Sequence, residues 1–100
     1  MQFYDVHPGS KLVLLGDKLQ MRASRYAPPN GTRMVLSLYL LAENNTQYRY
    51  DCLIARVAVP KNTPRDEQKR LLETMADIVA TRMNKEYRGI KIVNRKPKEN

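Results

Sequence analysis

The sequence has 100 residues, 42% of them hydrophobic, with 18 Lys and Arg against 10 Asp and Glu and a formal net charge of +8. This length predicts one domain with a core of its own, and the hydrophobic content excludes an intrinsically disordered class. A single cysteine, Cys52, allows no internal disulfide, which favours a reducing, cytoplasmic location. The first residues lack the pattern of a signal peptide, and the apolar run from Met34 to Ala42 is far shorter than the ~20 residues that span a bilayer, so we expect no membrane contact.

Four segments have the composition of β-strands and follow one another with short turns. Residues 11–15 and 18–26 are joined by Gly16-Asp17, and glycine in the first of two linking residues is typical of a type II′ hairpin. Pro and Asn-Gly reverse the chain before residues 32–42, the clearest strand. Residues 46–59 form the fourth strand, which is rich in Tyr, Ile and Val.

The fourth strand has an irregular alternation. From Cys52 until Arg56 is reached, side chains of both parities are apolar. A β-bulge near Asp51-Cys52 explains this pattern, and so does burial of both faces by the following helix or by a second subunit. Of the two, we favour burial.

Residues 64–86 are predicted to form an amphipathic helix. Thr63 is its expected N-cap, Pro64 its first helical residue and Gly89 the residue that ends it. The polar arc of this helix alternates in sign, which indicates a solvated surface and not a basic recognition helix. Residues 90–93 follow as a short strand.

Together these elements predict an α+β fold. It consists of a four-stranded antiparallel β-meander packed by one C-terminal amphipathic helix, with a short final strand and a basic tail. We assign residues 1–94 to a single domain and residues 95–100 to a basic, disordered tail.

The sequence contains no motif for catalysis, metal binding or a cofactor. His7 is the only histidine and the four glycines stand alone, so neither a His/Cys metal site nor a phosphate-binding glycine loop is predicted. Cys52 lies among apolar residues, where a free cysteine usually acts as a small hydrophobe and not as a nucleophile paired with His7. We therefore expect a protein without enzymatic activity, catalytic residues, metal or cofactor.

The alternation of residues 18–26 and 32–42 assigns cations and tyrosines to the face of the sheet away from the helix. Cations compensate phosphates and aromatic rings stack on unpaired bases, so this pattern predicts binding of single-stranded or structure-tolerant nucleic acid. The predicted binding residues are Lys18, Arg22, Tyr26, Arg33, Tyr39 and Arg49, together with Arg95 and Lys96 of the tail.

The same face also carries Val35 and Leu41, which indicate partial burial. The alternative prediction is a protein–protein interaction module that docks through this face or through an edge strand. Such a module is either a homodimer or a small accessory or inhibitor protein of the kind that phages and mobile elements encode. The third interpretation is that this face of the sheet is exposed to solvent and binds no partner.

Overall fold

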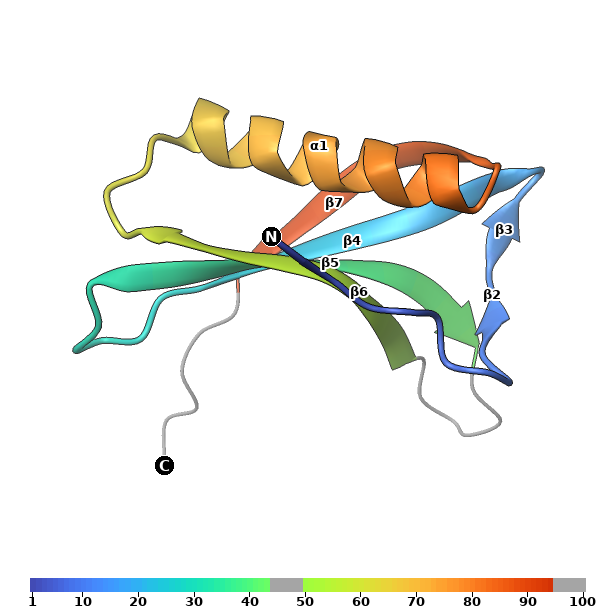
Figure 1. The fold of residues 1–100 in the computed structure, drawn as a ribbon, viewed down its shortest axis with the longest axis horizontal. Helices are drawn as coiled ribbons and strands as arrows, with labels where there is room; N and C mark the ends of the chain where they lie inside the picture. Colours follow the sequence, from blue (N-terminus) through green and yellow to red (C-terminus); the bar gives the residue numbers. More distant parts are fainter. Residues whose placement is uncertain (44–49, 95–100) are drawn as a thin grey trace.

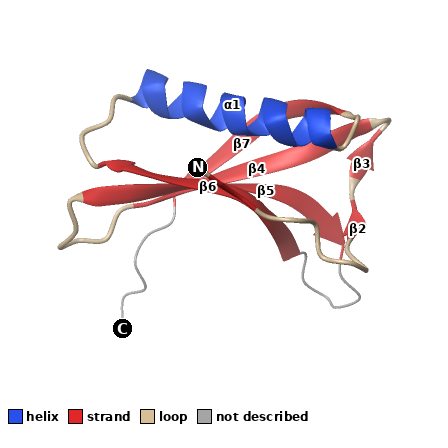
Figure 2. Ribbon diagram, in the orientation of Figure 1, coloured by secondary structure: helices blue, strands red, loops and turns tan. Residues whose placement is uncertain are grey.

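One helix lies across one face of a curved sheet in this computed structural model, which describes residues 1–43 and 50–94 (Figures 1 and 2). The fold is therefore α+β, with one helix and a mostly antiparallel sheet of seven strands among the described residues. In chain order the elements are β1 (Gln2–Phe3), β2 (Lys11–Leu12), β3 (Leu14–Leu15), β4 (Lys18–Tyr26), β5 (Arg33–Glu43), β6 (Tyr50–Pro60), α1 (Arg65–Arg82) and β7 (Glu86–Asn94).

Strands β4, β5 and β6 correspond to three strands of the predicted four-stranded antiparallel meander, and β7 lies on the far side of β4, parallel to it. Because β6 also runs parallel to β4, helix α1 is a crossover that carries the chain over β5 and β4 to the opposite edge of the sheet. The predicted final strand, 90–93, was too short: β7 has nine residues and adds a fourth long strand to the sheet.

The predicted strand 11–15 is divided at Val13 into two short strands. Strand β2 pairs with the end of β5, whereas β3 pairs with the start of β4. The start of β4 and the end of β5 diverge, and β2 and β3 lie between them (Figure 1). The hairpin at Gly16-Asp17 is confirmed, and Gly16 has the positive φ, 62°, that its turn requires.

The irregular alternation of β6 is caused by a β-bulge, the interpretation that we did not favour. Leu38 pairs with Ala55 and the next residue, Tyr39, pairs with Leu53, so Ile54 is the extra residue of β6. The bulge lies two residues beyond the position considered from the sequence. It lets both Ile54 and Ala55 be buried, at 1% and 0% exposure, although they are consecutive.

Both predicted ends of the helix need correction. The N-cap is Pro64, in extended conformation, and not Thr63, whose hydroxyl instead donates to the Pro60 carbonyl at 2.7 Å. The helix ends at Arg82 instead of residue 86, because Asn84 adopts a left-handed conformation with φ 53°. The N–H groups of Asn84 and Lys85 bond the carbonyls of Thr81 and Ala80, which is the Schellman pattern and leaves Gly89 without the predicted role.

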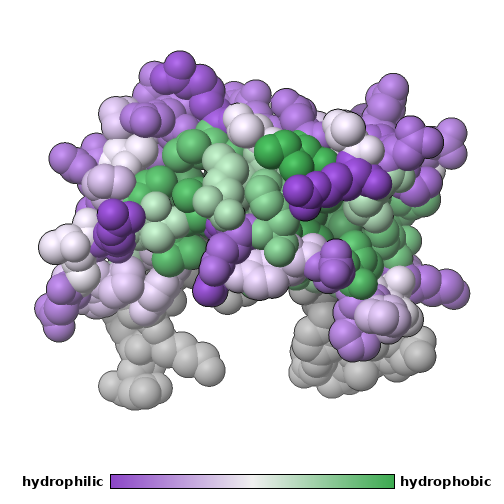
Figure 3. All heavy atoms as spheres, viewed as in Figure 1, coloured by the Kyte–Doolittle hydropathy of each residue, from purple (hydrophilic) through white to green (hydrophobic). Residues whose placement is uncertain are grey.

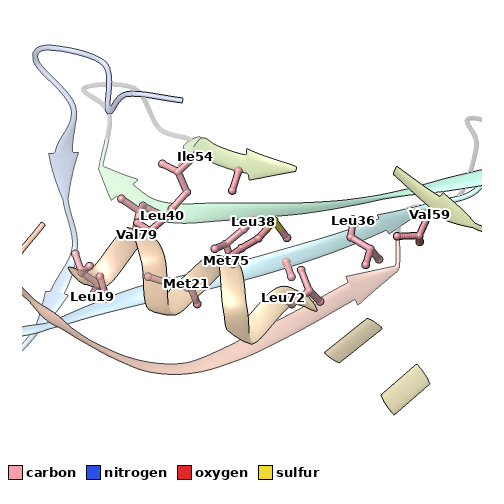
Figure 4. Packing of buried hydrophobic residues seen from close by; sticks show 14 of the residues in the cluster. Leu19, Met21, Leu36, Leu38, Leu40, Ile54, Val59, Leu72, Met75 and Val79 are labelled. Atoms are coloured by element: carbon pink, nitrogen blue, oxygen red, sulfur yellow. The ribbon is translucent and has the colours of Figure 1, made fainter. Parts of the chain in front are cut away.

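The core lies between α1 and the sheet. Figure 4 shows leucine and methionine side chains of β4 and β5 pointing toward Leu72, Met75 and Val79 of the helix. Leu38 and Met75 are completely buried. In Figure 3 hydrophobic residues gather in the middle of the view, below the hydrophilic border along which α1 runs.

A side-chain hydrogen bond of Tyr87 connects β7, at the edge of the sheet, to the helix. The Tyr87 hydroxyl donates to Oδ1 of Asp77 at 2.8 Å. Burial, this hydrogen bond and the negative charges of Asp77 and Glu73 raise the pKa of Tyr87 to about 12.

Leu38→Ala should lower the free energy of unfolding by about 2–5 kcal/mol, because it leaves a cavity under the helix. Leu15→Ala is the matched control, since Leu15 is 46% exposed; it should change stability by about 0.5 kcal/mol or less. Urea unfolding followed by circular dichroism measures both. Equal losses in the two variants would contradict the placement of the core.

Asp77→Asn should shift the highest tyrosine titration step toward pH 10, which absorbance at alkaline pH detects. Because folding raises this pKa, the stabilisation is complete below about pH 10 and is lost as the pH rises through about 12. The free energy of unfolding of the wild type should therefore fall across this range more than that of Tyr87→Phe. Titration curves of Asp77→Asn and wild type that superimpose would contradict the assignment.

Candidate nucleic-acid interface

The face of the sheet away from α1, here named the outer face, carries polar and aromatic side chains in rows across the strands. Met21, Ala23, Leu36 and Leu38 are buried toward the helix, so their neighbours along each strand project outward. Residues paired across strands lie on the same face. The rows consist of Lys91, Arg22, Tyr39 and Leu53 in the first; Val93, Ser24, Ser37, Arg56 and Gln2 in the second; and Tyr26, Val35 and Ala58 in the third.

Two serines lie at the centre of the outer face and are nevertheless buried. Ser24 is 6% and Ser37 is 8% exposed, and the two are direct cross-strand partners. No helix or strand of the described chain packs on this face. Arg22 and Tyr39, both half-buried, lie in the row next to the serines.

The structure brings five of the eight predicted residues together on the outer face. Tyr26 is 37% exposed, and Arg33 is exposed with its Nη1 donating to the Ala58 carbonyl at 3.3 Å. Lys18 is less available than expected, because its Nζ lies 3.7 Å from a carboxylate oxygen of Glu86. The five residues are Lys18, Arg22, Tyr26, Arg33 and Tyr39. The other three, Arg49, Arg95 and Lys96, lie outside the described residues.

Arg56 is an outer-face cation that the sequence analysis missed. It lies opposite both Ser37 and Gln2, and its Nε donates to Oε1 of Gln2 at 3.0 Å. Tyr4 donates to the same oxygen at 2.9 Å, and its ring centroid lies 5.8 Å from the guanidinium carbon of Arg56. These contacts fix the orientation of Arg56. The sequence feature that could have identified Arg56 is the alternation of side chains along β6. This alternation places Arg56 on the outer face only if the extra residue Ile54 is taken into account.

Lys91 is the second missed cation. It pairs with Arg22 in the parallel register between β7 and β4, so it extends the first row to the edge of the sheet. Its position between Ile90 and Ile92 indicated an outward direction. The parallel pairing that places it beside Arg22 joins residues far apart in the chain and has no local signal in the sequence.

A depression of about 310 Å³ opens beside Arg56. It is lined by Met1, Gln2, Val35, Arg56, Val57 and Ala58. The combination of apolar side chains and one guanidinium suits a flat, partly polar group such as a nucleobase next to a phosphate.

The charge of the protein is divided unequally between its elements. Helix α1 carries four basic and four acidic side chains and so contributes no net charge. The whole excess of +8 therefore belongs to the strands, the connecting segments and the C-terminal residues. The helix surface therefore offers a polyanion no net electrostatic attraction.

His7 and Cys52 line one small depression of about 200 Å³, together with Ser10 and Glu43. The Cys52 thiol donates to Oγ of Ser10 at 3.3 Å, so its hydrogen bond is to a hydroxyl and not to the imidazole. Among residues 1–43 and 50–94, no group of three or more His, Cys, Asp or Glu side chains is arranged to hold a metal ion. The absence of enzymatic activity stays a prediction.

Comparison of the chain with models of protein families, with curated proteins and with solved structures found no match. No helix in the described part of the chain is long and apolar enough to cross a membrane.

Proposed function

We propose that this protein binds single-stranded nucleic acid across the outer face of its sheet. The observation that carries the proposal is the arrangement of cations around tyrosines on one face of the β-sheet, while the opposite face is covered by a helix without net charge. The cations of this face are Lys18, Arg22, Arg33, Arg56 and Lys91.

Single strands suit the outer face better than a duplex does. The exposed ring of Tyr26 and the half-buried ring of Tyr39 are available to bases only if those bases are unpaired. Stacking on such rings contributes about 1–3 kcal/mol per base and tolerates any sequence. Helix α1, the element that would enter a major groove, lies on the other side of the sheet and has no basic surface.

Protein–protein interaction is the second candidate function. It is favoured by one specific observation, the exposure of Ile92 and Val93, at 44% and 36%, on the edge strand β7.

Binding to a labelled oligothymidylate should weaken steeply with salt. Four to five phosphate contacts predict a slope of log K against log salt of roughly −3 for single strands, measured by fluorescence anisotropy. Replacing Arg22, Arg33 and Arg56 together by Gln should reduce the magnitude of this slope by about 2. The matched control replaces Lys61, Arg65 and Arg70 by Gln, which removes the same charge elsewhere and should leave the slope nearly unchanged. Equal effects of the two triple variants, or no binding at low salt, would refute the proposal.

Tyr26→Leu should weaken binding to the oligothymidylate by about 5- to 150-fold, which corresponds to the loss of one stacked base. Tyr26→Phe keeps the ring and should bind within about threefold of the wild type. The same anisotropy assay measures both, with a blunt duplex of the same length as a competitor. Stacking at Tyr26 would be contradicted if the two variants bind equally or if the duplex competes as well as the single strand.

A further inference from the structure

The edge of the sheet at β7 is open. Strand β7 pairs with β4 along one side, and no strand of the described chain pairs with its other side. An unpaired edge presents a row of backbone N–H and C=O groups that can accept another strand. Ile92, on the helix side of this edge, is 44% exposed, and Val93, on the outer face, is 36% exposed. This edge thus combines free backbone groups with apolar side chains on both faces.

A groove runs along the same edge, between α1 and β7. It has a volume of about 350 Å³, with Leu72, Ile90 and Ile92 as its apolar part. Two charged residues of the helix, Lys69 and Glu73, also line it, and both are exposed. A partner that adds a strand to β7 and fills this groove needs apolar side chains on its helix side and charges that complement Lys69 and Glu73.

We infer that the partner is a second copy of this chain, paired antiparallel through β7 about a twofold axis at Ile92. This register places Ile92 against Ile92 of the partner subunit and covers the more exposed of the two apolar side chains at this edge. It places Lys91 opposite the partner's Val93, so that among residues 90–94 no like charges are directly opposite. Moving the axis by one residue to Lys91 would pair two lysines directly, which is unfavourable. Of these two axis positions, Ile92 is therefore favoured.

The groove carries one charge of each sign, Lys69 and Glu73, one helical turn apart. It therefore adds no net charge to the repulsion between two copies of the chain.

The pairing also keeps both helices on the same side of the joined sheet, because the axis is perpendicular to it. The two outer faces then form one continuous surface, with Lys91 of each copy beside the axis. The inference does not depend on the proposed nucleic-acid function, since it is based on the edge and the groove alone.

Sedimentation equilibrium of the wild type over a wide concentration range tests the association. The mass should rise from 11.6 kDa toward twice that value. Association should strengthen with salt, because each copy carries a formal charge of +8, whereas nucleic-acid binding should weaken. A protein that keeps the mass of one chain at high concentration and high salt would overturn the inference without affecting the nucleic-acid proposal.

A cysteine pair tests the register, in a background in which Cys52→Ser removes the natural thiol. The two copies of Ile92→Cys are direct partners and lie within disulfide distance, about 4.5–5.5 Å between Cα atoms. Under mild oxidation by oxidised glutathione this variant should form a covalent dimer. Val93→Cys is the matched control: its two copies lie diagonally across the axis, about 8 Å apart, and should crosslink poorly. Equal crosslinking of the two variants, or crosslinking of Val93→Cys alone, would overturn the register.

Discussion

In residues 1–43 and 50–94 the sheet has one apolar face and a single helix to cover it, and the rest of the structure follows from this constraint. The 18 residues of α1 extend over about 27 Å, whereas the 11 residues of β5 extend over about 36 Å. The N-terminal segment covers part of the remainder: Phe3, Val6 and Leu12 pack against the core. The guanidinium carbon of Arg82, at the end of the helix, lies 4.8 Å from the centroid of the Phe3 ring. This contact connects the helix to the N-terminal segment. All of these elements cover the inner face, and no element of the described chain covers the outer face.

Arg56 has a fixed orientation although no element of the described chain covers the outer face. Gln2 accepts a hydrogen bond from its Nε, and the ring of Tyr4 lies 5.8 Å from its guanidinium carbon. Side chains that are already restricted lose less conformational freedom when a ligand binds. An ordinary wet sheet face extends its cations into solvent, and their ordering would oppose binding. The fixed orientation of Arg56 is therefore an argument for the proposed binding surface that is separate from net charge.

The fold was predictable where its signal is local. The alternation of residues 18–26 and 32–42 correctly assigned their inner and outer faces, because each pattern lies within one strand. The end of the helix was wrong, since Asn84 adopts the left-handed conformation for which glycine is the usual residue. Arg56 and Lys91 were missed for a different reason. The outward direction of Arg56 depends on a bulge whose position is set by pairing with β5, and the place of Lys91 depends on a crossover between distant segments.

The proposed dimer and the proposed ligand affect each other through charge. Two copies of +8 repel when their edges join, and this repulsion opposes the apolar contact at Ile92. A polyanion that lies across both outer faces reduces the repulsion, and the joined sheet offers it cations from two copies around Lys91. Because binding linkage is reciprocal, a ligand that favours the dimer must also bind the dimer more tightly than it binds one copy. The open edge of β7 and the basic outer face, which adjoin at Lys91 and Val93, would then act as one binding unit.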